Sequence, residues 1–512
     1  MSSNKKTYMV TTPIYYPTDI PHLGAAYAMV YADCCARYRR MREEHVCLIT
    51  GSDEHGQKVQ NEAKSRRKTP IEYADRMVAG FQNACKKLQV SYDTFLRTTQ
   101  ESHIKVVETV FEKLKASGDI YLGEYEGWYC STCESFWPNT MIENRRCPRP
   151  ECKQSVESLH EGGYFFKLSA YQKPLLEHIE KNPDFIQPKT DRNEIIAFLK
   201  QGQQDLCITR KGPVWGIPAP SDPEFTIYVW FDALLSYLSA AGYGEDSFSL
   251  NWPPDFMVIG KDMQKFHAIV LASICMALDI PLPKTILVQG WMISGGKRVS
   301  RSAAGSANVV EMVDEFGPDA LRYYLLRDVP PGANFEFSTI KLTGRLNREL
   351  ANDLGNLFSR SIAMVIKYCD GKIPEPGKKG AGERNLARIF KEVKNEYKKS
   401  MDRMDTREAL ESVWDLVDGL NKYIVDNAPW EQYRNGNFDR LNTSLYSIMD
   451  YLRIITLMCM PFMPRAAIKM WRKLGFKDAL WVKKLDGVNP DLMPPGQEVK
   501  MQSPLFPKVE LS

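Results

Sequence analysis

The sequence predicts an α/β protein, in which a parallel sheet is interrupted by an insertion and followed by an all-helical C-terminal part. Two observations predict this fold. In the N-terminal part, short apolar runs alternate with glycine turns and helical patterns, as in parallel sheets with crossover helices. After about residue 343, every periodic segment has helical spacing. At 512 residues the chain is long for a single core, so about two to four domains are expected.

The first half of the sheet is predicted from residue 7 onward. Its elements are a strand at 7–16, a helix at 22–43, a strand at 46–50, and helices at about 70–88 and 102–117. The second strand runs into the polar turn Gly51-Ser52-Asp53-Glu54-His55-Gly56. Strand, glycine turn and helix in this order predict a Rossmann-type sheet, with a ligand at the carboxyl ends of the strands.

Beyond residue 117 the pattern changes twice. Cysteines, short strands and aromatic residues at 118–215 predict an insertion, and apolar runs then return at 225–230, 256–259 and 285–288. Helices are predicted at 343–368, 384–402, 405–427 and 436–460. The expected domains are the sheet's first half at 1–117, the insertion at 118–215, the sheet's second half at 216–290, a linker at 291–342, a helical domain at 343–489 and a proline-rich surface tail at 490–512.

Composition limits the class of protein. Hydrophobic residues make up 44% and charged residues 25%, which is typical of a soluble globular protein. A net charge of +4 is too small to indicate nucleic acid binding by itself. The N-terminus lacks the pattern of a signal peptide, and no apolar run approaches the roughly 18 residues that span a bilayer. Most of the twelve cysteines are scattered, which favours a reduced, cytoplasmic protein without membrane partners.

Four of the cysteines form a cluster within the predicted insertion. Cys130 and Cys133 are separated by two residues, and Cys147 and Cys152 by four. Paired cysteines at this spacing are typical of tetrahedral thiolate coordination of zinc. The alternative is a set of unligated thiols. We expect a structural Zn²⁺ site rather than a catalytic one, because four protein ligands leave no open coordination position.

Two short segments carry charge and glycine at positions that suit a nucleotide. His22-Leu23-Gly24-Ala25 lies where the first strand meets the first helix, and a helix N-terminus attracts phosphate. Arg298-Val299-Ser300-Arg301-Ser302 follows a glycine pair, and its cations and hydroxyls suit a pyrophosphate leaving group. Taken singly, each has a plainer interpretation, namely a structural histidine at a helix start and a solvated basic loop.

Together the two segments resemble the HIGH and KMSKS signatures of class I aminoacyl-tRNA synthetases. Other stretches resemble the methionyl-tRNA synthetase family: Thr11–Tyr16, Gly51–Gly56, Trp215–Pro218, Tyr228–Ala233, Gly260–Asp262, Asp319–Tyr324 and Leu350–Leu357. The resemblance covers about residues 7–460. It implies a Rossmann catalytic domain split by a zinc-knuckle insertion, and an all-α anticodon-binding bundle. The implied protein is a monomer that uses methionine, ATP with Mg²⁺, and tRNA(Met).

The resemblance also implies roles for individual residues. The catalytic set is His22, Arg298, Ser300, Arg301 and Ser302, and the ATP-binding set is His22, Gly24, Lys261, Asp262 and Arg301. The methionine-binding set is Ile14, Tyr16, Asp53, Trp230, Ala233, Leu234, Tyr237 and His267. Asn356, Arg360 and Trp430 match the positions that read the anticodon. By periodicity alone, Trp230, Ala233 and Tyr237 would more often be core residues.

The chain departs from the family's pattern at several positions. The second signature histidine is Ala25, the two signature lysines are Arg298 and Arg301, and a histidine usual before the second signature is Gln289. Losing one transition-state donor typically costs about 2.7–4 kcal/mol. Besides an active ligase, the sequence therefore leaves open an impaired paralogue that binds methionine or tRNA without efficient activation. A weaker alternative is adenylation of methionine for a non-translational acceptor.

Overall fold

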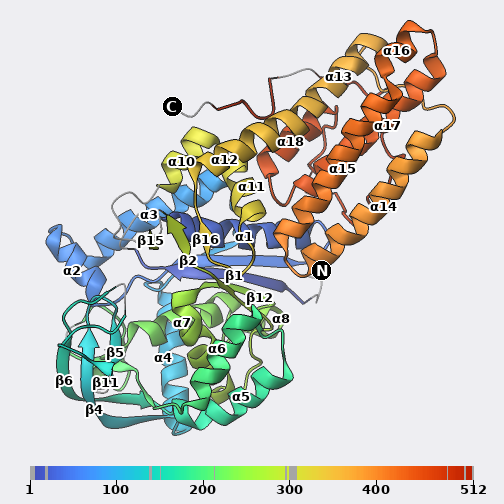
Figure 1. The fold of residues 1–512 in the computed structure, drawn as a ribbon. Coiled ribbons are helices and arrows are strands. Elements are labelled where there is room, and N and C mark those ends of the chain that lie inside the picture. The colour runs from blue at the N-terminus through green and yellow to red at the C-terminus, as the bar shows by residue number, and fades with distance from the viewer. Residues whose placement is uncertain are drawn as a thin grey trace. The chain divides into compact units, whose positions relative to one another are not determined.

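The computed structural model describes residues 6–17, 21–137, 141–149, 152–212, 214–294, 297–298, 308–480, 483–500 and 503–509. The chain divides into two compact units. Unit 1 comprises Met1–Pro21, Val46–Ala84 and Tyr92–Gln289, and unit 2 comprises His22–His45, Cys85–Ser91 and Gly290–Ser512. Figure 1 shows the elements of both units, coloured along the chain.

Unit 1 is built on a six-stranded sheet with the order β3-β2-β1-β12-β13-β7, in which every neighbouring pair is parallel. Its strands are β1 (Tyr8–Tyr15), β2 (Val46–Ser52), β3 (Thr94–Arg97), β7 (Ile186–Gln187), β12 (Phe256–Gly260) and β13 (Ile286–Gln289). The direction of winding reverses between β1 and β12, and ligands bind at such a switch point, beyond the carboxyl ends of the strands. The predicted Rossmann-type sheet is confirmed.

Unit 1 also contains helices, several of which supply its core. They are α2 (Gln57–Ser65), α3 (Pro70–Leu88), α4 (Glu101–Ala116), α5 (Gln172–Lys181), α6 (Lys189–Lys200), α7 (Val229–Ala241), α8 (Phe248–Asn251), a π-helical turn η4 (Phe266–Leu271) and α9 (Ala272–Ala277). Phe111 of α4 and Phe231 of α7 are fully buried in one cluster with Met257 of β12. Because β12 is buried, its sequence is a continuous apolar run, which is why the sequence identifies it.

Two strands of unit 1 differ from the prediction. The run at 225–230 was expected in the parallel sheet, but β11 (Asp222–Ile227) pairs antiparallel with β9 (Thr209–Lys211) and β10 (Pro218–Ala219). Val229 and Trp230 already belong to α7. Conversely, β7 lies within residues 118–215 and is the edge strand beside β13. At two residues, β7 is too short to leave a periodic signal.

The predicted insertion contains a second, antiparallel sheet with the order β5-β4-β6-β8. Its strands are β4 (Ile120–Cys130), β5 (Ser135–Trp137), β6 (Glu157–Phe166) and β8 (Leu206–Cys207). β4 and β6 form a long ladder from Ile120↔Phe166 to Tyr129↔Glu157. Cys130 ends β4, and Ser135 begins β5 directly opposite it. The cysteine pair Cys130 and Cys133 therefore lies in the turn between two paired strands.

Unit 2 is predominantly helical (Figure 1). Its helices are α1 (Leu23–Arg40), α10 (Val309–Phe316), α11 (Pro318–Asp328), α12 (Thr339–Arg345), the π-helical η5 (Leu346–Gly355), α13 (Asn356–Cys369), α14 (Ala381–Asp402), α15 (Thr406–Asn427), α16 (Pro429–Arg434), α17 (Phe438–Cys459) and α18 (Pro464–Lys473). A small sheet joins β14 (Met292–Ser294) to β15 (Lys297–Arg298) and β16 (Phe335–Glu336). The four helices predicted after residue 343 are confirmed.

A buried ion pair joins α1 to α11 within unit 2. Arg322 Nη1 lies 2.8 Å from Asp33 Oδ2, and both side chains are fully buried. Arg322 also donates to the carbonyls of Leu88, Pro461 and Phe462. Burial by itself would raise the pKa of Asp33, but Arg37, Arg322 and the bonds from Ser91 lower it to about 2. The carboxylate is therefore ionised at neutral pH.

The C-terminal segment differs from the expected surface tail. Met493, Val499, Leu505 and Phe506 are all less than a tenth exposed. The Val509 backbone N–H donates to Asn347 Oδ1 at 3.0 Å, and Asn347 Nδ2 donates back to Val509 O at 2.8 Å. The prolines of this segment suggested an exposed chain, but its widely spaced apolar residues pack back onto unit 2.

Candidate functional site

The first part of the candidate site lies at the carboxyl ends of β1 and β2, in unit 1. Ile14 is in β1, Tyr16 directly follows that strand, and Asp53 directly follows β2. The Asp53 backbone N–H donates to Tyr15 O at 3.0 Å, and the side chain is largely buried. Gly51 allows the neighbouring strand to come close, because a Cβ there would lie 2.2 Å from Leu96 O. The structure therefore brings these three predicted residues to the expected edge of the sheet.

Helix α7 and the π-helical turn η4 supply an aromatic wall. Trp230 stacks on Phe266 with ring centroids 3.9 Å apart and an angle of 3° between the rings. Tyr237 Oη lies 2.9 Å from His267 Nε2, while His267 Nδ1 donates to Met263 O at 3.0 Å. Burial lowers the pKa of His267 to about 4, so its imidazole is neutral at pH 7. Its Nε2 therefore accepts a hydrogen bond from the Tyr237 hydroxyl.

The remaining predicted residues of this set also lie on α7. Ala233 and Leu234 are buried at 4% and 1% exposure, whereas Trp230 is partly exposed. This part of α7 therefore contains both buried side chains and the partly exposed indole of Trp230. Walls of neutral aromatic and aliphatic groups suit a polarizable apolar side chain such as a thioether, which binds by close contact rather than by charge.

Asp232 is a buried carboxylate of α7 that binds two histidines. His55 Nδ1 donates to Asp232 Oδ2 at 2.7 Å, and His103 Nε2 donates to Asp232 Oδ1 at 2.6 Å. Burial by itself would raise the pKa of Asp232, but the two imidazoles lower it to about 2. His55 is two residues after Asp53, so this carboxylate links α7 and α4 to the turn that carries Asp53. The sequence analysis did not identify this network, because its members are far apart along the chain.

The turn after β2 is also fixed by an arginine fork. Arg97 Nε donates to Glu54 Oε1 at 2.7 Å, and Arg97 Nη2 donates to Glu54 Oε2 at 2.9 Å. Glu54 is fully buried, and Thr99 Oγ1 donates to it at 2.6 Å. A bidentate guanidinium–carboxylate pair fixes geometry as well as charge. The two residues that follow Asp53, Glu54 and His55, are therefore both held in place.

The predicted ATP-binding pair Lys261 and Asp262 directly follows β12. Lys261 Nζ lies 3.2 Å from both Asp191 Oδ1 and Glu194 Oε2 of α6, and these carboxylates raise its pKa against the effect of burial. Close by in sequence, Gln264 is 1% exposed, and neither of its amide atoms has a hydrogen-bond partner among the described residues. Unpaired buried amides are costly, typically about 1–3 kcal/mol, so Gln264 is a ligand candidate that the sequence analysis missed.

Gln289, the last residue of β13, pairs in register with Gly260 of β12. It is 4% exposed, and its Nε2 has no hydrogen-bond partner within the described part of the chain. The position that departs from the family's histidine therefore still presents a polar amide at the carboxyl edge of the sheet.

The first signature segment begins α1, in unit 2. His22 is the N-cap of this helix, and its Nδ1 accepts from the Ala25 backbone N–H at 3.3 Å. Gly24 leaves room for the imidazole, because a Cβ there would lie 3.0 Å from two ring atoms of His22. Arg298 is described only by its backbone, in β15, and Ser300, Arg301 and Ser302 lie outside the described residues. Their predicted roles stay predictions.

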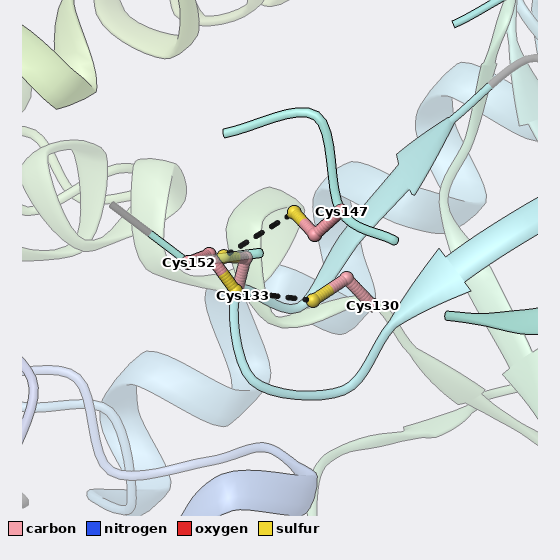
Figure 2. Close-up of side chains that lie close together, drawn as sticks. All are labelled: Cys130, Cys133, Cys147 and Cys152. Carbon is pink, nitrogen blue, oxygen red and sulfur yellow. Dashed lines mark hydrogen bonds between the residues drawn. The ribbon is translucent and has the colours of Figure 1, made fainter. Parts of the chain in front are cut away.

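The four cysteines of the insertion converge in unit 1 (Figure 2). All four sulfur atoms lie within 4.8 Å of one another, with 3.7 Å between the Sγ atoms of Cys130 and Cys152 and 3.9 Å between those of Cys133 and Cys147. Tetrahedral zinc with Zn–S bonds of about 2.3 Å requires sulfur separations of roughly 3.8 Å. The donor set and its spacing therefore fit Zn²⁺.

The predicted anticodon residues lie on two helices of unit 2. Asn356 begins α13 and is exposed, and Arg360 follows one turn later. Arg360 Nη2 donates to Asn421 Oδ1 at 3.3 Å, and its buried Nε has no hydrogen-bond partner among the described residues. Trp430 lies on α16 and is 36% exposed.

Helices α13 and α16 are in contact. Tyr433 of α16 stacks on Tyr368 of α13, with ring centroids 4.6 Å apart. Trp430 of α16 reaches the surface, and unpaired bases stack well on such rings. Both helices therefore present groups that suit single-stranded RNA.

Two family models match the chain. The model described as tRNA synthetases class I (M) matches residues 8–161 and 150–362. The model described as the anticodon binding domain of methionyl tRNA ligase matches residues 373–511. Together they extend over nearly all of the two units.

Curated relatives and solved structures agree with these models. The methionine–tRNA ligase of Caldanaerobacter subterraneus subsp. tengcongensis is 42% identical over 99% of this chain and 80% of that protein. The Thermotoga maritima methionine–tRNA ligase is 40% identical over 98% of this chain and 80% of that protein. The Mycobacterium tuberculosis methionyl-tRNA synthetase in complex with methionyl-adenylate is 34% identical, with a TM-score of 0.93 over 98% of this chain and 100% of that chain.

Proposed function

The chain belongs to the methionyl-tRNA synthetase family of class I, and from this membership we infer that it is an ATP-dependent methionine–tRNA ligase. The structural observation that best supports the inference is the neutral aromatic wall of Trp230, Tyr237 and His267 beside the sheet edge that bears Asp53. This wall offers an apolar surface to the side chain of methionine, and Asp53 offers a carboxylate to its ammonium group.

The reaction has two steps. A carboxylate oxygen of methionine attacks the α-phosphorus of ATP, a new P–O bond forms, and the bond to pyrophosphate breaks. A hydroxyl of the 3′-terminal ribose of tRNA(Met) then attacks the activated carbonyl carbon, and AMP leaves with the C–O bonding pair. The protein contributes positioning and charge stabilisation, which supply most of the catalysis in such transfers.

We assign the residues to these steps as follows. Ile14, Tyr16, Ala233 and Leu234 complete the methionine pocket. His22, Gly24, Lys261 and Asp262 bind ATP, which carries Mg²⁺ with it. Arg298, Ser300, Arg301 and Ser302 stabilise the pyrophosphate. Lys261 is paired with Asp191 and Glu194, so this assignment requires ATP to replace one of these partners.

The cysteine cluster is assigned to a structural Zn²⁺. Cys130, Cys133, Cys147 and Cys152 would hold the ion with four thiolates, and the ion would supply folding energy rather than chemistry. We further propose a monomer, a cytoplasmic location, and the domain limits given above, except that β7 belongs to the parallel sheet and the C-terminal segment packs on unit 2. Within the described residues, no helix is long and apolar enough to cross a membrane.

The helices α13 and α16 are assigned to the anticodon. Asn356 and Arg360 offer hydrogen-bonding groups from one helix face, and Trp430 offers a surface on which an unpaired base can stack. Among the described residues the Nε of Arg360 has no hydrogen-bond partner, which supports a role in binding rather than in packing alone.

Charging of tRNA transcripts tests the proposal. Transcripts of tRNA(Met) should accept methionine in the presence of ATP, and matched transcripts with a changed anticodon should accept it far more slowly. Equal charging of both transcripts would refute the anticodon assignment. Methionine activation without charging of either transcript would point to a different acceptor.

A further inference from the structure

Glu134 is a buried acidic residue next to the zinc-binding cysteines. It directly follows Cys133, in the turn between β4 and β5 that Figure 2 shows with Cys130 and Cys133. The side chain is 4% exposed, and the backbone is in the left-handed region with a φ of 47°. Non-glycine residues rarely adopt this conformation. The surrounding contacts must therefore favour this placement of Glu134.

The carboxylate of Glu134 binds outside the insertion, at the end of β1. Tyr16 Oη donates to Glu134 Oε2 at 2.7 Å, and it also lies 3.0 Å from His55 O. The Lys58 backbone N–H donates to Glu134 Oε1 at 3.2 Å, and Tyr228 Oη donates to the Glu134 carbonyl. Glu134 is thus hydrogen-bonded to Tyr16 at the sheet edge, to Lys58 at the start of α2, and to Tyr228 at the start of α7.

The chain leaves space for this contact at Gly56. A Cβ at Gly56 would lie 2.4 Å from Glu134 Oε1 and 2.6 Å from Tyr16 Oη. Gly56 also has a φ of 106°, which L residues with a side chain rarely adopt. The turn after β2 therefore admits the carboxylate and the phenol together only because residue 56 is glycine.

We propose that Glu134 is a positioning residue for methionine, which holds the ring of Tyr16 in place and so links the cysteine turn to the amino-acid pocket. This inference rests on the proposed function, in which Tyr16 lines that pocket. Glu134 acts through Tyr16 and does not contact the substrate. When Glu134 is removed, the Tyr16 hydroxyl loses its hydrogen bond to a carboxylate and keeps its 3.0 Å contact with the His55 carbonyl. The ring is then held less firmly, and methionine binding must order it.

The proposed effect on methionine binding also depends on the metal site, because Glu134 follows a cysteine of that site in the chain. Cys133 and Glu134 are adjacent, so a thiolate fixed by Zn²⁺ also fixes the backbone from which the carboxylate projects. Loss of the ion is expected to weaken methionine binding by the same route. Binding of ATP, which is assigned to other residues, is expected to change little.

The test measures methionine affinity of the full chain by titration calorimetry, together with KM values from pyrophosphate exchange. Ordering one side chain costs about 0.5–1.5 kcal/mol, so Glu134→Ala should raise the methionine Kd about two- to twelvefold. The KM for ATP should stay within about twofold. Glu134→Gln keeps an acceptor oxygen and should have a smaller effect. Glu143→Ala is the matched control, since Glu143 is an exposed acid of the same cysteine turn region.

A double-mutant cycle tests whether Glu134 acts through Tyr16. In a Tyr16→Phe background, which has no hydroxyl to hold, Glu134→Ala should have no further effect on the methionine Kd. Cys147→Ser, with its zinc content measured separately, should raise the methionine Kd in the wild-type background but not in Tyr16→Phe. An unchanged Kd in Glu134→Ala, or additive effects in the cycle, would overturn the proposal.

Two results distinguish a failure of this proposal from a failure of the proposed function. A wild-type chain that neither binds nor activates methionine contradicts the function itself. A wild-type chain that does both, with a Glu134→Ala variant that matches it, contradicts only the role of Glu134. If Glu134→Ala fails to fold, Glu134→Gln and Tyr16→Phe decide the question, because coupling requires that their effects on the methionine Kd are not additive.

Discussion

Replacing Asp232 by asparagine tests how the methionine pocket is supported. The substitution keeps the shape of the side chain but removes the charge that accepts hydrogen bonds from His55 and His103 at 2.7 and 2.6 Å. Asp232 is 1% exposed, so water cannot replace these partners. We expect the variant to fold less stably and to hold the Asp53 turn less firmly.

The pKa of Asp232 gives the size of the effect. Its pKa is lowered from 3.8 to about 2 in the folded chain, and each unit corresponds to about 1.36 kcal/mol. The charged form is therefore favoured by about 2–3 kcal/mol over a neutral one. Asparagine resembles the neutral form, so the free energy of unfolding should fall by about that amount at pH 7.

The sign of the pH dependence follows from the same shift. Because the pKa of Asp232 is depressed in the folded state, its contribution is present above the unfolded value of 3.8 and is lost as the pH falls through about 2. The stability difference between wild type and Asp232→Asn should therefore shrink as the pH is lowered below about 4.

Urea unfolding at several pH values, followed by tryptophan fluorescence, is the measurement. Asp246→Asn serves as the control, because Asp246 is an exposed acid shortly after the same helix. A loss below about 0.5 kcal/mol at pH 7 in Asp232→Asn, or a loss that does not depend on pH, would refute this account of the network.

Three further predictions concern the other assigned groups. His22→Asn should keep a side-chain cap on α1 but lower the rate of methionine activation, measured by pyrophosphate exchange, by a factor of about 10² to 10³. His22→Ala should in addition lower the free energy of unfolding by about 1 kcal/mol, because the cap is lost, and thermal unfolding would show this. Trp430→Ala should raise the KM for tRNA(Met) by the equivalent of about 1–3 kcal/mol and leave exchange unchanged, and a loss of exchange would contradict the assignment. Cys147→Ser should copurify without zinc and unfold at lower temperature, as metal analysis and calorimetry would show, and full zinc occupancy in this variant would exclude Cys147 as a ligand.

The sequence predicted the buried strands of the sheet well and the short or exposed ones poorly. β12 and β13 are buried and therefore have continuous apolar runs. β7 has two residues and left no pattern, and β11 shares its apolar run with the start of α7. Whether a strand pairs in a parallel or antiparallel way depends on its partner, which local periodicity does not reveal.

The candidate site was predictable where its residues lie in short recognisable segments. Cys130 and Cys133 lie in one turn, so their spacing indicated a metal site. Trp230 and Tyr237 lie on one helix, where spacing alone favoured core residues and only the resemblance indicated a pocket. Asp232 and Glu134 were missed because their partners are distant in sequence, such as Tyr16, which is 118 residues from Glu134. Buried polar contacts of this kind become visible only when the fold brings the segments together.

Methionine-dependent exchange of labelled pyrophosphate into ATP tests the central claim most directly. The purified chain with zinc bound should catalyse this exchange with methionine and not with isoleucine or leucine, because a neutral, closely fitting pocket discriminates by contact. Absence of exchange above background at high protein concentration, in a sample shown to be folded, would contradict the claim that this chain activates methionine.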